Sequence, residues 1–104
     1  MPQVEIPKEW RNRVCEILQT EAIRLGKSST TWRYEVYGPI REFLSMPHAT
    51  GCPVVMETPP GDTYEFYFSF LGETFYGKIL LRMDHKRLVI FSAHRPLKLK
   101  LSCE

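Results

Sequence analysis

Residues 64–83, with the sequence YEFYFSFLGETFYGKILLRM, decide the fold. In the first half of this stretch an aromatic side chain recurs at every second position, which is the period of a strand with one buried face. The residues of this aromatic row are Tyr64, Phe66, Phe68 and Phe70. Gly72 and Glu73 fit a two-residue turn with glycine first, a turn that matches the twist of antiparallel strands. The stretch therefore predicts two strands, 64–71 and 75–83, that fold back on each other around a shared core face.

The chain beyond this hairpin continues the same pattern. In the strand 75–83, alternation places Phe75, Ile79, Leu81 and Met83 on one face, and Tyr76, Lys78, Leu80 and Arg82 on the other. Asp84–Arg87 is a polar turn, and residues 88–93 are apolar at both parities, which is typical of a central strand. His94, Arg95 and Pro96 form a break or a bulge. Leu97, Leu99 and Leu101 then alternate with Lys98 and Lys100, which predicts a last strand.

The N-terminal part of the chain predicts one long helix over residues 7–26. Pro7 suits the first turn, where a missing N–H costs nothing, and Gly26 is a typical residue at a helix C-terminus. The apolar stripe of this helix consists of Trp10, Val14, Ile17, Leu18, Ala22 and Leu25. The opposite face is of mixed charge, with Arg11, Arg13, Glu16, Glu21 and Arg24, and we interpret it as a solvated face.

Between the helix and the hairpin the pattern is less regular. Residues 27–31 form a polar loop, 32–37 alternate like a short strand, and Gly38-Pro39 breaks that strand. Pro39 can begin a second short helix that ends before Pro47 and carries Ile40, Phe43 and Leu44 at helical spacing. Residues 47–63 are loop-like, with 53–57 as a candidate edge strand. We predict an α+β fold: a single domain, 1–104, in which one long N-terminal helix packs on an antiparallel meander of four to five strands, with a short second helix.

The charge is distributed unevenly along the chain. The net charge is +2, but residues 78–100 carry seven basic residues and one acid, Asp84, a net +6. The seven are Lys78, Arg82, Lys86, Arg87, Arg95, Lys98 and Lys100. Residues 1–77 hold seven basic and ten acidic residues, a net −3, and Glu104 adds one more negative charge. Cations fixed on strands favour a polyanionic partner such as RNA or DNA.

Several classes of protein are disfavoured by the sequence. No apolar run approaches the ~18 residues of a membrane span, and the start of the chain lacks the pattern of a secretory signal, so we expect no membrane association. Cys15, Cys52 and Cys103 are odd in number and widely spaced, which argues against a disulfide framework and for the cytoplasm. His48 and Cys52 could supply two metal ligands where a structural zinc site needs four, so we expect no metal and no cofactor. The common nucleotide-binding and hydrolase motifs are absent.

The candidate catalytic residues are His94, Arg95, Arg82 and Lys78. A histidine that titrates near neutrality can act as acid or base in RNA transesterification, and the three cations can stabilise charge on the phosphate. Lys78 and Arg82 share a strand face about 13 Å apart, a distance that spans two neighbouring phosphates. The structural alternative is that His94 caps the end of its strand by hydrogen bonding. His85, in the polar turn, is expected to be an exposed bystander.

A second group is predicted to bind RNA without taking part in chemistry. Its members are Lys98, Lys100, Tyr76 and Arg87. The lysines and arginine would contact phosphates, and Tyr76, together with Tyr67, could stack on bases. The alternative is that these residues form a solvated, charged sheet face that resists aggregation.

The run from Gly77 to Arg95, GKILLRMDHKRLVIFSAHR, resembles the closing hairpin of the RelE/ParE-like toxins of bacterial toxin–antitoxin modules. The shared features are a glycine, a strand ending in Arg-x-Asp, a short turn, an apolar strand and a terminal His-Arg. The resemblance implies a small cytoplasmic toxin that cleaves mRNA, often on the ribosome, without a metal, and that an antitoxin protein neutralises. Lys78, Arg82, His94 and Arg95 match basic or acid–base positions of that family.

Some ParE-like members act on gyrase, so the fold alone does not choose the target. The chain also departs from the family, because the C-terminal tyrosine of many RelE members is replaced by Ser102-Cys103-Glu104. A second hypothesis is therefore a non-catalytic interaction module that binds a protein partner or nucleic acid through the same basic face.

Overall fold

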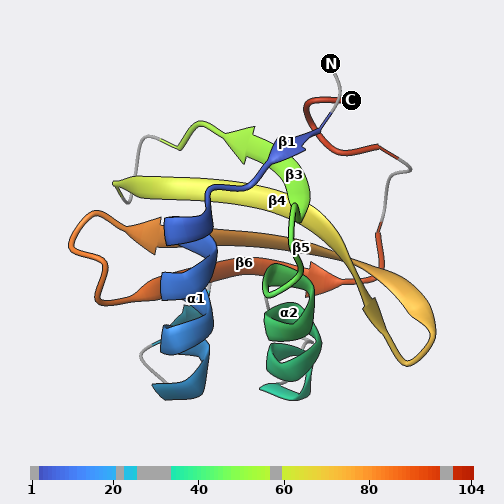
Figure 1. Cartoon of the computed structure of the whole chain (residues 1–104), viewed down its shortest axis with the longest axis horizontal. Coiled ribbons are helices and arrows are strands. Elements are labelled where there is room, and N and C mark those ends of the chain that lie inside the picture. The colour runs from blue at the N-terminus through green and yellow to red at the C-terminus, as the bar shows by residue number, and fades with distance from the viewer. Residues whose placement is uncertain (1–2, 21–22, 26–33, 57–59, 97–99) are drawn as a thin grey trace.

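The fold is α+β, with two helices and an antiparallel meander sheet, as the sequence predicts. The computed structural model describes residues 3–20, 23–25, 34–56, 60–96 and 100–104. The elements are β1 (Val4–Glu5), α1 (Lys8–Thr20), β2 (Ile23–Leu25), a 3₁₀ turn (Tyr34–Val36), α2 (Tyr37–Leu44), β3 (Thr50–Val54), β4 (Gly61–Phe70), β5 (Glu73–Arg82) and β6 (Leu88–His94). The strand order is β1-β3-β4-β5-β6-β2, and both helices lie on one face of the sheet (Figure 1).

The core lies between that face and the helices, and the aromatic row of β4 is at its centre. Phe66 is fully buried and stacks on Phe43 of α2 with ring centroids 5.2 Å apart. Trp10 of α1 meets Tyr64 edge-on at 5.0 Å, and its indole nitrogen donates to the backbone oxygen of Asp62. The apolar positions of β5 and β6 complete the core with Ile79, Leu81, Leu88, Ile90 and Ala93. The predicted core faces of β4 and β5 are confirmed at these positions, whereas Met83 lies in the turn after β5 and is exposed.

The turn between β4 and β5 lies one residue earlier than predicted. Leu71 and Gly72 form it, and both have positive φ, 53° and 75°, as the mirror-image turns favoured in hairpins require. The pair Phe70↔Glu73 closes the hairpin, so Glu65 faces Lys78 and Tyr67 faces Tyr76. A turn at Gly72-Glu73 would have placed Lys78 opposite Tyr67, because moving a two-residue turn by one position moves the register by two.

The end of α1 also differs from the prediction of a helix over 7–26. The helix ends at Thr20, and Ile23–Leu25 forms β2, which pairs in parallel with β6 through Ile23↔Leu88. Ala22 and Gly26 lie outside the described residues. β6 is apolar at both odd and even positions, and the short strand β2 beside it satisfies backbone groups along its outer edge. β6 therefore lies between β5 and β2.

The region before β3 is helical rather than extended. The predicted strand over 32–37 is wrong from Tyr34 onward: Tyr34–Val36 is a 3₁₀ turn, and α2 begins at Tyr37. Residues 32–33 lie outside the described part of the chain. Gly38 and Pro39 do not interrupt the secondary structure. Both lie in the first turn of α2, where the missing N–H of Pro39 is tolerated. The predicted second helix and its end before Pro47 are confirmed.

The strand predicted over 53–57 begins earlier, at Thr50, and Pro53 lies inside it. β1 pairs only with Thr50 and Gly51, so within the described residues no strand lies beside Pro53 on the side away from β4. An edge position of this kind tolerates a residue that cannot donate a backbone hydrogen bond.

Arg11 is buried, with 6% of its surface exposed, although the sequence places it on a solvated helix face. Its guanidinium donates to three backbone oxygens: Nε to Ile6 at 2.9 Å, and Nη1 to Leu44 at 3.0 Å and to Met46 at 2.8 Å. The last two oxygens lie at the C-terminal end of α2, where helix carbonyls lack partners within the helix. Arg11 thus joins the start of α1 to the end of α2, a contact that depends on tertiary structure alone.

The two ends of the chain lie close together at the β1–β3 edge (Figure 1). Cys52 of β3 and Cys103 form a disulfide with their Cα atoms 5.5 Å apart, a bond that contradicts the argument against a disulfide framework. The sequence separation of 51 residues hides this pairing, because the fold returns the C-terminus to β3. Of the predicted last strand, residues 97–99 lie outside the described part; Leu101 is buried but is not in a strand. None of the described helices is long and apolar enough to cross a membrane.

Candidate functional site

The candidate site lies on the sheet face that points away from the helices, which we call the outer face. Its central residues are Glu65, Tyr67, Tyr76, Lys78, Ser92 and His94. Alternation along β5 directs Tyr76, Lys78 and Arg82 to this face, because Ile79 and Leu81 between them point into the core. Cross-strand pairing then aligns Tyr67, Tyr76 and His94 in one row across β4, β5 and β6. The neighbouring row is Glu65, Lys78 and Ser92.

His94 ends β6 with its ring beside Tyr76, and the two ring centroids are 5.7 Å apart. Its Nδ1 lies 2.7 Å from the backbone oxygen of Arg95. A carbonyl oxygen only accepts hydrogen bonds, so Nδ1 carries a hydrogen, and in the neutral ring Nε2 holds the lone pair. The side chain is half-buried rather than covered by a helix. The arrangement can therefore present an oriented base at the outer face, and it also includes the strand-end hydrogen bond that the structural alternative expects.

Lys78 lies in the next row, two residues along β5 from Tyr76. Its Nζ lies 5.6 Å from the centroid of the Phe91 ring. A β-bulge between Lys78 and Ile79 shifts the pairing, so Ile79 faces Ile90 and Phe91 is the extra residue of β6. Lysine over an aromatic face is a favourable cation–π arrangement, and here it fixes the position of a cation on the outer face.

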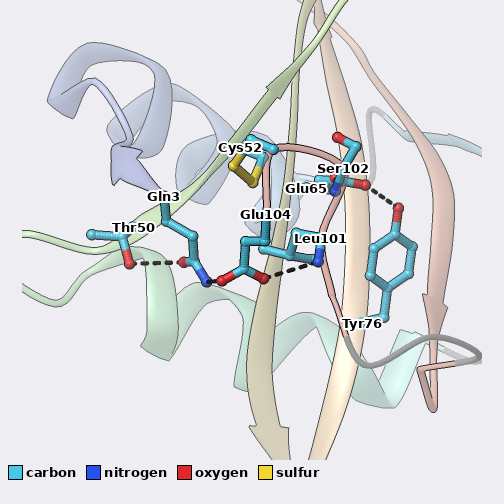
Figure 2. The surroundings of a disulfide bond; sticks show 9 residues. Gln3, Thr50, Cys52, Glu65, Tyr76, Leu101, Ser102 and Glu104 are labelled. Atoms are coloured by element: carbon cyan, nitrogen blue, oxygen red, sulfur yellow. Dashed lines mark hydrogen bonds between the residues drawn. A yellow bond between two sulfur atoms is a disulfide. The ribbon is translucent and has the colours of Figure 1, made fainter. Parts of the chain in front are cut away.

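Glu65, opposite Lys78, is a buried carboxylate with 5% of its surface exposed. One oxygen accepts the hydroxyl of Tyr76 at 2.5 Å, and the other accepts the backbone N–H of Ser102 in the C-terminal tail (Figure 2). Burial by itself raises the pKa of this carboxyl, but the hydrogen bonds from Ser102 and Tyr76 and the charge of Lys78 together hold its pKa below the usual value. Glu65 is thus ionised and fully engaged at neutral pH.

Tyr76 is fixed by the same contact. Burial, and then the hydrogen bond and charge of Glu65, raise the pKa of its hydroxyl well above the usual value. The hydroxyl is therefore a poor acid, and the ring is held beside His94 as a flat surface. Burial also raises the pKa of Tyr67, with smaller effects from Glu104 and Glu65.

The other predicted residues lie farther out. Arg82 is four positions along β5 from Lys78, about 13 Å away on the same face. Arg87 is exposed in the segment between β5 and β6. Arg95 follows His94, and its guanidinium pairs with Glu73 at 2.5 Å, with 71% of the Arg95 side chain exposed. Lys100 is exposed in the tail, and Lys98 lies outside the described residues. The structure therefore brings Tyr76, Lys78 and His94 together on the outer face, with Arg82 farther along that face and Arg87 in the turn. Arg95 instead pairs with Glu73, which lies opposite Phe70 and has the core-side parity of β5.

Sequence reasoning missed Glu65 and the tail. A lone carboxylate in the aromatic strand is visible in the sequence, but its partner Lys78 follows only from the correct hairpin register. Ser102 and Cys103 carry no local signal, since their contacts on β3 and β4 depend on the fold.

A hollow of about 290 Å³ lies between α2 and β4, and none of the predicted catalytic residues lines it. It is lined by Pro39, Glu42, Phe43, Met46, Tyr67, Phe68, Ser69 and Thr74. Across the described part of the chain, no group of three or more His, Cys, Asp or Glu side chains is placed to hold a metal ion.

Comparisons with protein-family models, with curated proteins and with solved structures find no match to this chain.

Proposed function

We propose that this chain is a toxin-like endoribonuclease that binds RNA on its outer face, with His94 as the acid–base residue. The observation that carries the proposal is the geometry of His94: Nδ1 is held by the Arg95 carbonyl, the ring stands beside Tyr76, and Nε2 is left to accept a proton. Lys78 supplies a positioned cation one row away. The hairpin from Gly77 to Arg95 that resembles the RelE/ParE-like toxins holds these residues.

The chemistry that such a site can perform is transesterification. Nε2 of His94 takes the proton of a ribose 2′-hydroxyl, and the 2′-oxygen attacks the adjacent phosphorus. The 5′-oxygen leaves with a proton from solvent, which gives a 2′,3′-cyclic phosphate and a 5′-hydroxyl. Lys78 and Arg95 stabilise the negative charge that grows on the phosphate oxygens, with Arg95 exchanging Glu73 for the phosphate. Tyr76 offers its ring to a base, and Arg82, Arg87, Lys98 and Lys100 extend the phosphate contacts.

The test is cleavage of a labelled single-stranded RNA by the purified chain, in parallel reactions with and without EDTA. We expect products that end in a 2′,3′-cyclic phosphate, and we expect cleavage to continue in EDTA. His94→Gln should slow cleavage by at least ~100-fold, the usual contribution of a general base. His85→Gln is the matched control, because this histidine is exposed in the turn after β5 and contacts other residues through its backbone: its oxygen accepts from Arg13 and its N–H donates to the backbone oxygen of Arg82.

Equal cleavage by wild type and His94→Gln would contradict the proposed role of His94. Inducible expression gives an independent check: the wild type should arrest growth, whereas His94→Ala/Arg95→Ala should not. We also propose a cytoplasmic location and an antitoxin partner, which a small acidic neighbour in the adjacent reading frame would support.

A second candidate is a non-catalytic module that binds RNA, or an acidic protein, through the outer face. The observation that favours it is the carboxylate beside the positioned cation of the outer face: Glu65 faces Lys78 across β4 and β5. Arg95 is likewise paired with a carboxylate, that of Glu73, at the other side of the sheet. RNA binding that weakens steeply with salt, without any cleavage product, would select this function over the enzyme.

A further inference from the structure

The C-terminal tail, residues 100–104, is attached to the sheet by one disulfide and by non-covalent contacts. Cys103 is bonded to Cys52 of β3, and the backbone N–H of Ser102 donates to Glu65 of β4 (Figure 2). Leu101 is buried, with 3% of its surface exposed. Because Cys52 pairs directly with Glu65 across β3 and β4, both attachments fall on adjacent positions of the outer face.

Among the described residues, the remaining hydrogen bonds that connect the tail to other parts of the chain are exposed. The Gln3 side-chain amide donates to a Glu104 carboxylate oxygen at 3.2 Å, and the Thr50 hydroxyl donates to the side-chain oxygen of Gln3 at 3.0 Å (Figure 2). The other Glu104 oxygen accepts from Leu101 within the tail itself. Exposed hydrogen bonds of this kind compete with water and contribute little. The disulfide is therefore the main tether of the tail.

We propose that Cys52–Cys103 is a redox latch that holds the tail against the outer face and that opens in a thiol-reducing environment. In opening, a dithiol reductant gives up two electrons and two protons: the S–S bond breaks, two cysteine thiols form, and the reductant becomes a cyclic disulfide. The tail is then released from β3 and β4. This regulatory inference rests on the proposed function, because the outer face that the tail borders is the proposed RNA site.

Release of the tail changes the electrostatics around Lys78. In the latched state the two oxygens of Glu65 are occupied by Tyr76 and Ser102. Loss of the Ser102 N–H leaves one buried carboxylate oxygen without its donor, and the nearest cation across the strands is Lys78. Lys78 then pairs with Glu65 and is withdrawn from phosphate. The exposed cation Lys100 also loses its fixed position. The latched, oxidised form is therefore the form that binds RNA more tightly.

Cys15 does not compete for the disulfide. It lies on α1, on the opposite side of the sheet, half-buried, and its Sγ lies 3.8 Å from both the Arg41 backbone oxygen and Ser45 Oγ. Burial raises the pKa of this thiol, with only partial offset from Ser45 and Arg41, so little thiolate forms at neutral pH. Cys15→Ser is thus a matched control for loss of a cysteine.

The first test uses the full chain and needs no RNA. Thiol titration of the unfolded, unreduced protein should find one free thiol, and three after dithiothreitol. Hydrogen exchange of the Ser102 and Glu104 amides should become at least ~10-fold faster in dithiothreitol, while the Ile79 amide in β5 keeps its protection. Cys52→Ser/Cys103→Ser should show the fast exchange without reductant, and Cys15→Ser should behave as the wild type.

Three free thiols in the unreduced protein, or equal protection of the Ser102 amide with and without reductant, would overturn the latch. Loss of protection at Ile79 as well would also overturn it, because the disulfide would then hold the whole domain together rather than the tail alone.

The second test measures binding of a fluorescent single-stranded RNA to the oxidised and reduced forms. We expect reduction to weaken binding by roughly three- to tenfold, the effect of losing about one hydrogen bond or charge contact. Unchanged affinity despite tail release would overturn the regulatory step. If neither form binds RNA, the proposed function fails, while the exchange data still decide whether the latch opens.

Discussion

Arg11 provides the sharpest test of the energetics, because a charged side chain on the first turns of a helix is usually dispensable and this one is buried. We predict that Arg11→Met lowers the free energy of unfolding by about 3 kcal/mol. Methionine keeps the aliphatic stem and its packing, so the loss isolates the guanidinium and its three hydrogen bonds.

The magnitude follows from the fate of the three backbone oxygens. The oxygens of Ile6 and Leu44 are buried, and each loses its donor at a cost of about 1–3 kcal/mol. The Met46 oxygen is only partly buried, so water can replace the guanidinium there at little cost. Arg11→Met also removes the free-energy cost of burying the guanidinium charge, and this gain offsets part of the cost of the lost hydrogen bonds. The expected net loss of stability is therefore about 3 kcal/mol.

Urea denaturation followed by tryptophan fluorescence measures this loss directly, with Lys8→Met as the control. Lys8 opens the same helix, is exposed, and should change stability by less than about 0.5 kcal/mol when replaced. Arg11→Lys should fall between the two, since one ammonium cannot reach three oxygens with the geometry of a planar fork. A loss below about 1 kcal/mol for Arg11→Met would refute the argument that Arg11 joins the two helices.

Three further predictions use the same assay. Gly77→Ala should lose about 1–3 kcal/mol, because a new Cβ would lie 2.8 Å from the Phe66 ring, whereas Gly38→Ala, with open space around it, should be neutral or stabilising. Leu71→Asn should stabilise by up to about 1 kcal/mol, since Leu71 is exposed at positive φ in a turn that favours asparagine; an unchanged midpoint would count against the assigned turn. Glu65→Gln should reduce the dependence of the free energy of unfolding on pH at acid pH. The folded-state pKa of Glu65 is lowered, so its contribution is complete above the unfolded value of 4.5 and is lost as pH falls through the lower folded value; an equally steep pH dependence in both proteins would contradict this.

The sequence by itself determined the parts of this protein that depend on local periodicity. The alternation of Tyr64, Phe66, Phe68 and Phe70 specified a strand and its buried face, because side chains two apart in a strand point the same way. The same rule directed Tyr76 and Lys78 to the outer face. The apolar stripe of α1 was equally plain up to Leu18. The α+β class follows from these elements alone.

Tertiary structure decided what depends on register and on contacts between distant segments. A one-residue shift of the β4–β5 turn makes Glu65, rather than Tyr67, the partner of Lys78 on β4, and so places a carboxylate instead of a tyrosine on that side of the cation. Arg11 looked solvated because helical periodicity shows which residues share a face but not what covers it. Cys52 and Cys103 meet only because the fold returns the tail to β3. Local sequence patterns reflect the conformational preferences of residues close together in the chain. The contacts named above form between segments that are distant in sequence, so no short window of sequence predicts them.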